Sequence, residues 1–267
     1  MAHSIICPTH GPLIDLKQHC HNLAQFFISA NPYDFDPVTS WLKISSGITE
    51  VKFISDLFDP DVMWCGSAME YEDAKSEFHS RLICELTRFI FIWGGLELLV
   101  DMLTLKNCPH YPGKVNKVNY FLKENYKKRY QVIDHYQDVV ECLKILLTRN
   151  TWYGDVKDIF SSSKCTCDDL IGLKAVYKIR NLFAHGAFHF SEPEDWNMVK
   201  PLDVPIVATS SRIVLMTMQM LLLSYYDVLS FPIIQYGNSL DCEKEIQAED
   251  FLLKMHLKSF YEKTHHS

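Results

Sequence analysis

The chain has 267 residues, of which 48% are hydrophobic, 13% aromatic and 22% charged, and its formal net charge at pH 7 is -7. This composition excludes a disordered chain, and the length suffices to bury a sizeable core in one large domain or two small ones. The net negative charge excludes a general attraction to nucleic acid, because the molecule as a whole repels phosphate, so such binding needs a local basic patch.

The nine cysteines show no regular spacing, and the N-terminus lacks the basic region and long apolar core of a secretion signal. We therefore expect reduced thiols and a cytoplasmic protein. Cys7 and His10 have the spacing of a metal knuckle, but no second pair of this kind follows. This pattern favours a polar N-terminal segment over a structural zinc site, and we predict neither a metal nor a cofactor.

The sequence predicts an all-α fold, because proline and glycine cluster between long periodic runs and no hairpin dipeptide separates alternating segments. Residues 1–65 are predicted to form a partly helical N-terminal extension, and residues 66–267 a helical domain. The predicted elements are helices over residues 13–30, 48–57, 71–106, 114–126, 131–149, 169–185 and 247–262, with a loop over residues 31–40.

A further helix is predicted over the apolar stretch of residues 213–234, with Ser210 or Ser211 as its N-cap. The stretch is long enough to cross a bilayer. Gln219 and Asp227 interrupt it and Pro232 breaks its end, so a buried core helix is favoured and no membrane partner is expected. In the helix over residues 71–106, the adjacent glycines 94 and 95 indicate a kink or a close helix contact.

The helix over residues 169–185 has an unusual polar face. At about 100° per residue, Lys174, Lys178, Asn181 and His185 gather on one side, and Arg180 stands at the flank. The opposite side is apolar and faces the core: it carries Ile171, Ala175, Val176, Ile179, Leu182 and Phe183. Because the polar face has no carboxylate, it is a short cationic strip that suits a ligand bearing phosphate.

The end of this helix combines three functional groups with a stop signal. Asn181 and His185 are four residues apart, so their side chains can meet, and Gly186 is placed to form a left-handed cap. A histidine in the last turn is stabilised as a cation, and it can donate or accept a proton near neutral pH. Arg180 can bind two oxygens of a phosphate at once. Ordinary capping of a helix C-terminus is the alternative interpretation.

Arg180, Asn181 and His185 form the pattern R-N-x-x-x-H, which resembles the motif of the HEPN superfamily. With Gly186 and the preceding apolar helix, the chain is similar to the Apea-like branch of that superfamily. The stretches "FIFIWGGLELLV" and "SSRIVLMTMQMLLLSYY" resemble the helices before and after the motif helix, so the resemblance covers roughly residues 71–230.

The resemblance implies a HEPN-like helical bundle that dimerises with its two motif helices facing each other. Many members are metal-independent ribonucleases, often in defence against phage or as toxins, in which the ribose 2′-OH attacks the adjacent phosphate and leaves a 2′,3′-cyclic phosphate. By this resemblance His185 is the general acid or base, Arg180 stabilises phosphate charge, and Asn181 orients His185 or the backbone. DNA lacks the nucleophile and should be inert.

The helical wheel supports a homodimer with a composite site. Arg180 and His185 diverge by about 140° on one helix, so a single copy presents them poorly to one phosphate. A two-fold partner brings a second pair of these residues to the same cleft. A nuclease of this kind also needs restraint by a regulatory protein partner, by the N-terminal extension or by a trigger.

Several residues are predicted to support RNA binding. Glu97, in an apolar run, pairs either with Arg180 or His185, or structurally with some other basic group. The most basic stretch covers residues 114–130 and includes Lys127, Lys128 and Arg129; it either tracks an RNA backbone or forms a solvated helix face.

Arg212, near the start of the helix after the motif, is predicted to add to a basic cleft. Two alternatives to a ribonuclease stay open. One is a non-catalytic HEPN-like module that binds RNA, a nucleotide or another protein. The other is a structural scaffold whose motif only caps a helix.

Overall fold

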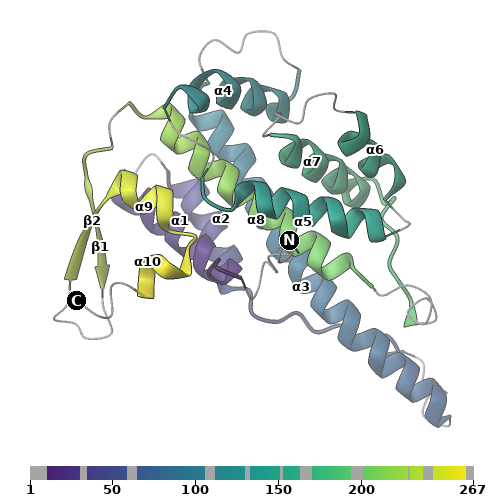
Figure 1. The fold of residues 1–267 in the computed structure, drawn as a ribbon. Coiled ribbons are helices and arrows are strands. Elements are labelled where there is room, and N and C mark those ends of the chain that lie inside the picture. The colour runs from purple at the N-terminus through teal and green to yellow at the C-terminus, as the bar shows by residue number, and fades with distance from the viewer. Residues whose placement is uncertain are drawn as a thin grey trace.

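The computed structural model describes residues 11–30, 35–58, 65–105, 112–129, 133–150, 153–162, 170–193, 201–227, 229–236 and 243–262. Within these ranges the chain is a helical bundle with one small antiparallel hairpin, which confirms the all-α prediction (Figure 1). The elements are α1 (Leu16–Ala30), α2 (Asp36–Gly47), α3 (Gly66–Met102), α4 (Lys114–Arg129), α5 (Tyr136–Arg149), α6 (Gly154–Ser162), α7 (Ile171–Ala184), α8 (Asp203–Tyr225), β1 (Pro232–Tyr236), β2 (Glu243–Gln247), α9 (Ala248–Lys254) and α10 (Lys258–Glu262).

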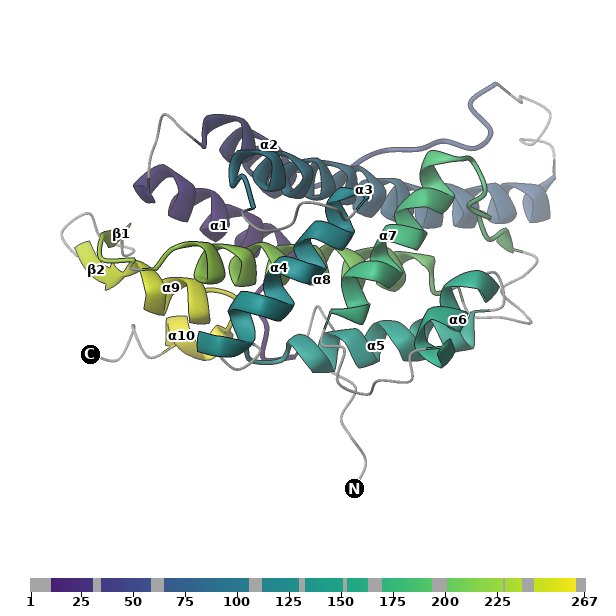
Figure 2. The ribbon, with the colours of Figure 1, turned by 90° about the horizontal axis from the view of Figure 1, so that it is seen from above.

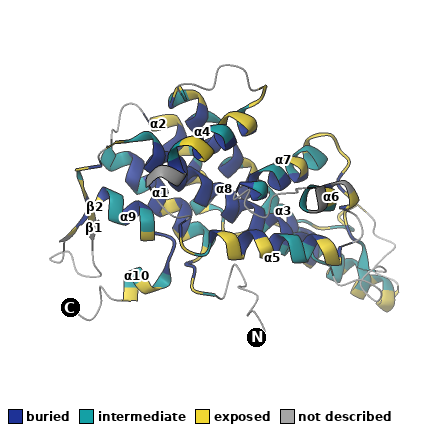
Figure 3. Cartoon of the chain, turned by 45° about the horizontal axis from the view of Figure 1, so that its top comes forward, coloured by how far each residue is buried: buried dark blue, intermediate teal, exposed yellow. Residues whose placement is uncertain are grey.

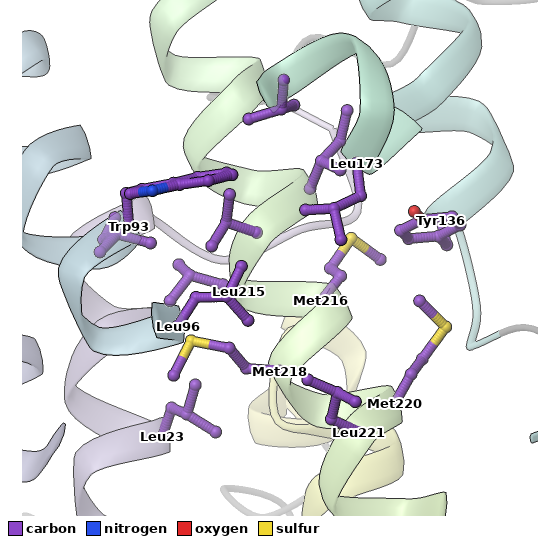
Figure 4. Packing of buried hydrophobic residues seen from close by; sticks show 14 of the residues in the cluster. Leu23, Trp93, Leu96, Tyr136, Leu173, Leu215, Met216, Met218, Met220 and Leu221 are labelled. Carbon is purple, nitrogen blue, oxygen red and sulfur yellow. The ribbon is translucent and has the colours of Figure 1, made fainter. Parts of the chain in front are cut away.

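The bundle is built around α8, which contacts α1, α3, α4, α5, α7 and α9. Figure 2 shows α8 running through the middle of the molecule, between α3 and α5. Its side chains Leu215, Met216 and Met218 have no exposed surface, and they pack among side chains of α1, α3, α5 and α7 (Figure 4). By length and composition α8 could cross a membrane, but 94% of its most apolar stretch is buried within the protein, as in a core helix (Figure 3).

The first two helices belong to this core. Leu23 and Phe27 of α1 and Leu42 of α2 are fully buried, and α1 packs against α2 and α8. At the contact between α2 and α3, a Cβ on Gly94 would lie only 2.4 Å from the ring of Trp41, so the predicted close helix contact is present at this glycine. Helices α1 and α2 are thus packed onto the rest of the bundle.

Two predictions for the N-terminal region were wrong. Residues 48–57 were predicted to form a helix and are not helical. The loop predicted over residues 31–40 is helical from Asp36 onward, where α2 begins. Pro37 made the start of α2 resemble a loop. Proline is nevertheless well tolerated in the first turn of a helix, where its missing N–H would have no intrahelical partner. The helical spacing of the buried residues Val38, Leu42 and Ser45 carries the true pattern.

The long core helix also starts earlier than predicted, at Asp203 rather than after Ser210 or Ser211. Pro205 sits in its first turn, and both serines are buried inside the helix. The hairpin of β1 and β2 was not predicted, and the single predicted helix over residues 247–262 is two short helices, α9 and α10.

Candidate functional site

The motif helix α7 is held against the bundle by its apolar face. Leu173, Ala175, Val176 and Ile179 are fully buried, and α7 contacts α4, α5, α6 and α8. A Cβ on Gly172 would lie 2.6 Å from a methyl group of Val140, so glycine at this position lets α7 approach α5 closely. This packing fixes which side of α7 faces outward, and with it the placement of the polar residues.

The C-terminus of α7 ends in the predicted left-handed glycine cap. Gly186 has φ of 66°. The amide of Gly186 donates to the carbonyl of Phe183 at 3.2 Å, and the amide of Ala187 donates to that of Leu182 at 2.8 Å. These two bonds are those of a Schellman motif, which satisfies carbonyls that the helix end would leave unpaired.

His185, the residue before this cap, is exposed. Its backbone amide donates to the Asn181 carbonyl at 3.0 Å. Within the described part of the chain, its side chain makes no hydrogen bond or ion pair. The imidazole therefore does not cap the helix, and it is available to a ligand or to another molecule.

A cleft of about 550 Å³ opens beside α7, between the end of α3, the start of α4 and α6. Its volume lies in the range typical of sites for small ligands. The walls combine basic, amide and aromatic side chains with a single carboxylate: Trp93, Glu97, Lys114, Asn116, Lys174, Tyr177, Lys178, Arg180 and Asn181 line it, together with Pro112, Gly113, Val115 and Ile159.

Arg180 is the best-defined cation of the cleft. Its guanidinium Nη2 lies 3.9 Å from the Glu97 carboxylate, and its Nη1 donates to the Asn181 Oδ1 at 3.4 Å. The Arg180 side chain is 36% exposed and the Glu97 side chain 37%, so both remain accessible from the cleft. An exposed ion pair of this length is weak, because water screens it, and a phosphate could compete for the guanidinium.

Three lysines surround this pair. Lys174 and Lys178 come from α7, and Lys114 comes from the first turn of α4. The Lys114 Nζ donates to the main-chain carbonyl of Glu97 at 3.2 Å and lies 2.5 Å from the Asp101 carboxylate. With Arg180, the cleft wall holds four basic side chains against one carboxylate, so it is locally positive on an acidic protein.

Two aromatic rings form one wall of the cleft. Trp93 and Tyr177 are stacked, with centroids 6.2 Å apart and an angle of 25° between their planes. The Trp93 indole donates to the Glu97 Oε1 at 2.7 Å, which fixes the carboxylate next to Arg180. Trp93 is 5% exposed whereas Tyr177 is 43% exposed, so Tyr177 is the ring that a ligand can reach.

Most of the predicted site residues on α7 and α3 therefore come together. One cleft is lined by Glu97, Lys174, Lys178, Arg180 and Asn181. Glu97 pairs with Arg180, which was one of the interpretations expected for it. The Glu97 side chain is half-buried rather than buried. His185 is not among the residues that line this cleft. Asn181 contacts Arg180, and no bond joins its side chain to His185 in the described part of the chain.

Arg212 does not line the cleft beside α7. Arg212 has no exposed surface, because α8 starts more than two turns earlier than predicted and Arg212 lies inside this core helix. Its guanidinium contacts His19 Nδ1 at 2.7 Å and the Ile14 carbonyl at 2.6 Å, so it joins α8 to the N-terminal region. The side chains predicted to track RNA at the end of α4, those of Lys127, Lys128 and Arg129, lie outside the described residues.

Two aromatic residues of the cleft, Trp93 and Tyr177, were not predicted as site residues. Trp93 lies in an apolar run and reads as core, but its spacing of four residues from Glu97 was a usable signal, because residues at this spacing meet on a helix. Lys114 opens the basic stretch of residues 114–130 that was predicted to contact RNA, but its place in this cleft depends on the tertiary fold.

Metal-binding residues do not gather in the parts of the chain that the structure describes: no group of three His, Cys, Asp or Glu side chains is placed to hold an ion there. Cys7 and His10 lie outside the described residues. The chain matches no protein-family model, no curated protein and no solved structure. The resemblance to HEPN proteins therefore stays a prediction that depends on the motif and its flanking helices.

Proposed function

We propose that the chain is a metal-independent endoribonuclease of the HEPN type, which acts as a homodimer and binds RNA in the cleft beside α7. The observation that carries the proposal is the clustering of Arg180, Lys174 and Lys178 with the exposed ring of Tyr177 in one cleft. Cationic groups bind the phosphate backbone and an aromatic face stacks a base, which is the pairing that single-stranded RNA requires.

In the proposed reaction the ribose 2′-oxygen attacks the adjacent phosphorus and the bond from phosphorus to the 5′-oxygen breaks. A base removes the 2′ proton and an acid protonates the departing 5′-oxygen, so the products are a 2′,3′-cyclic phosphate and a 5′-hydroxyl. His185 takes one of these proton-transfer roles. Arg180 neutralises the charge that develops on the phosphate, with Asn181 holding its guanidinium.

The arrangement of Arg180 and His185 supports a site shared by two copies. In one chain Arg180 lines the cleft, whereas His185 stands exposed at the end of the helix and outside that lining. A two-fold partner placed against the C-terminus of α7 would bring its own His185 to the cleft. We propose that the dimer is cytoplasmic, serves in defence or as a toxin, and is restrained by a regulatory protein partner.

A second candidate function is a non-catalytic module that binds RNA or a nucleotide. The observation that favours it is the pairing of Arg180 with Glu97, together with the absence of His185 from the cleft lining. Such a module would bind single-stranded RNA through the same basic and aromatic side chains but would generate no new 3′ ends.

The test is to incubate the protein with single-stranded RNA in excess EDTA and to analyse the ends of the products. The proposal predicts 2′,3′-cyclic phosphate ends from the wild type and their loss in Arg180→Ala and His185→Ala. His21→Ala and Arg149→Ala are matched controls at an exposed position of α1 and at the last turn of α5, and they should cleave as the wild type does. Equal cleavage by all five proteins would refute the proposal, and binding without cleavage would support the second candidate.

A further inference from the structure

A second and larger cavity, of about 720 Å³, lies at a different place in the fold. It is bounded by the start of α1, the extended segment of residues 49–53, the middle of α3 and the first turns of α8. Figure 2 shows the segment that follows α2 running alongside α3. No residue lines both this cavity and the cleft beside α7.

The wall of this cavity contains a buried positive charge, Arg212, with no carboxylate of the described residues within ion-pair distance and with Asp15 as the nearest negative influence. Arg212 has no exposed surface, and its partners in the described part of the chain are the His19 ring and the Ile14 carbonyl. Burial, followed by the charge of Arg212 and by His256, lowers the pKa of His19 well below 6.5, so His19 is neutral. Burial also lowers the pKa of Arg212, but only to about 10, and the guanidinium stays charged at neutral pH.

Unpaired polar atoms gather around the same cavity. The Nε of Arg212 is buried without a hydrogen-bond partner. The Nε of Arg88 is also buried without a partner, and Arg88 as a whole is 4% exposed. Arg88 forms an ion pair with Glu85 and donates to the Ile48 carbonyl at 2.7 Å, yet the second oxygen of Glu85 is also unpaired. A buried donor without a partner destabilises a fold, so such atoms at a cavity indicate a missing ligand group.

The remaining wall of the cavity determines the shape and character of that ligand. Leu16, Val51, Phe53, Val204 and Pro205 provide an apolar lining. The charged side chains that complete the rim carry both signs: these are Asp15, Lys17, Lys52, Glu50, Glu77 and Arg81. An apolar body with a single anionic head group fits a cavity that combines an apolar lining with the buried side chain of Arg212.

We propose that this cavity binds a small amphipathic anion, a molecule with one carboxylate or phosphate head and an apolar body. The head lies toward Arg212 and Arg88, where it offsets the positive charge of these two buried side chains. The body lies against Phe53, Val51 and Pro205. The proposal does not depend on the proposed ribonuclease activity, since the two sites share no residue.

The test is isothermal titration of the full chain with four probes of equal chain length: octanoate, octyl phosphate, octanol and octylammonium. We expect saturable binding of one anion per chain, about tenfold or more tighter than octanol, because a hydrogen bond to a charged group adds that much. The two anions distinguish a carboxylate site from a phosphate site. Equal binding of octanol or octylammonium, or no saturable binding of either anion, would overturn the proposal.

Two variants locate the binding. Ala208→Trp fills the cavity from α8 without removing any atom of the Arg212 network, and it should abolish anion binding. Ala68→Trp places the same side chain on α3 outside the cavity lining and should bind as the wild type does. Arg212→Met keeps the length of the buried side chain and should reduce anion binding to the level of octanol. Anion binding that survives in Ala208→Trp would place the ligand elsewhere and refute the proposal.

Discussion

The buried pair of His19 and His256 should make the stability of the fold depend on pH. Gln219 joins them: its Oε1 accepts from His19 at 2.8 Å, and its Nε2 lies 3.1 Å from His256 Nδ1. His256 Nε2 donates to the Asp134 carbonyl at 2.9 Å. Burial is the main cause that lowers the pKa of His256 from 6.5 to about 4, against the opposing hydrogen bond to Asp134, and the charge of Arg212 lowers it further.

The sign of the effect follows from the proton counts. Between pH 6.5 and about 4 the unfolded chain holds a proton on His256 and the folded chain does not, so stability falls as pH is lowered through this window. The stabilisation is fully present above pH 6.5. The pKa difference corresponds to about 3 kcal/mol at the lower limit, and His19 adds to the loss in the same direction.

The assay is urea unfolding of the wild type and of His256→Gln, each at several pH values from 7.5 to 4.5. Glutamine cannot titrate, and it retains an amide donor for the Asp134 carbonyl. Carboxylates contribute equally to both proteins, so the difference between their pH profiles isolates His256. We expect the difference in unfolding free energy to shrink by about 2 kcal/mol between pH 7 and pH 5. Parallel profiles for the two proteins would refute the reasoning.

Three further predictions concern α7 and its cleft. Gly172→Ala should destabilise the fold by about 1–3 kcal/mol in urea unfolding, because its Cβ would press on Val140, and an unchanged midpoint would contradict this. Gly186→Ala should cost about 1 kcal/mol by the same measurement, since φ of 66° disfavours any side chain there, whereas a stabilising effect would contradict the cap. Tyr177→Ala should weaken binding of single-stranded RNA by about 1–3 kcal/mol in fluorescence anisotropy, whereas Tyr177→Phe should bind as the wild type does. Equal RNA affinity of Tyr177→Ala and the wild type would exclude stacking of a base on this ring.

The sequence was informative where a pattern is local. The helical period and the glycine stop of α7 are set within a few turns, so the buried face and the cap at Gly186 could be predicted. The pairing of Glu97 with Arg180 was one of the interpretations left open, and it came from the resemblance to the helix before the HEPN motif. By contrast, Pro37 and Pro205 lie in the first turns of α2 and α8 but suggested loops. Proline is compatible with the first turn of a helix as well as with a loop, so the sequence alone did not distinguish the two.

The parts of the site that escaped prediction depend on tertiary packing. Lys114 joins the cleft only because the start of α4 returns to the end of α3. Arg212 was expected at the surface, but its surroundings include His19 and Ile14, almost two hundred residues away in sequence. A single sequence does not reveal that a charged residue in an apolar helix has polar partners from another element.

The most direct test of the account is to mix two inactive variants, Arg180→Ala and His185→Ala, under conditions that exchange subunits, and to measure RNA cleavage in EDTA. If each site takes Arg180 from one copy and His185 from the other, mixed dimers contain one intact site, and the mixture should recover about a quarter of wild-type activity. A mixture no more active than its separate components, with subunit exchange verified by size and label, would contradict a site shared between two copies.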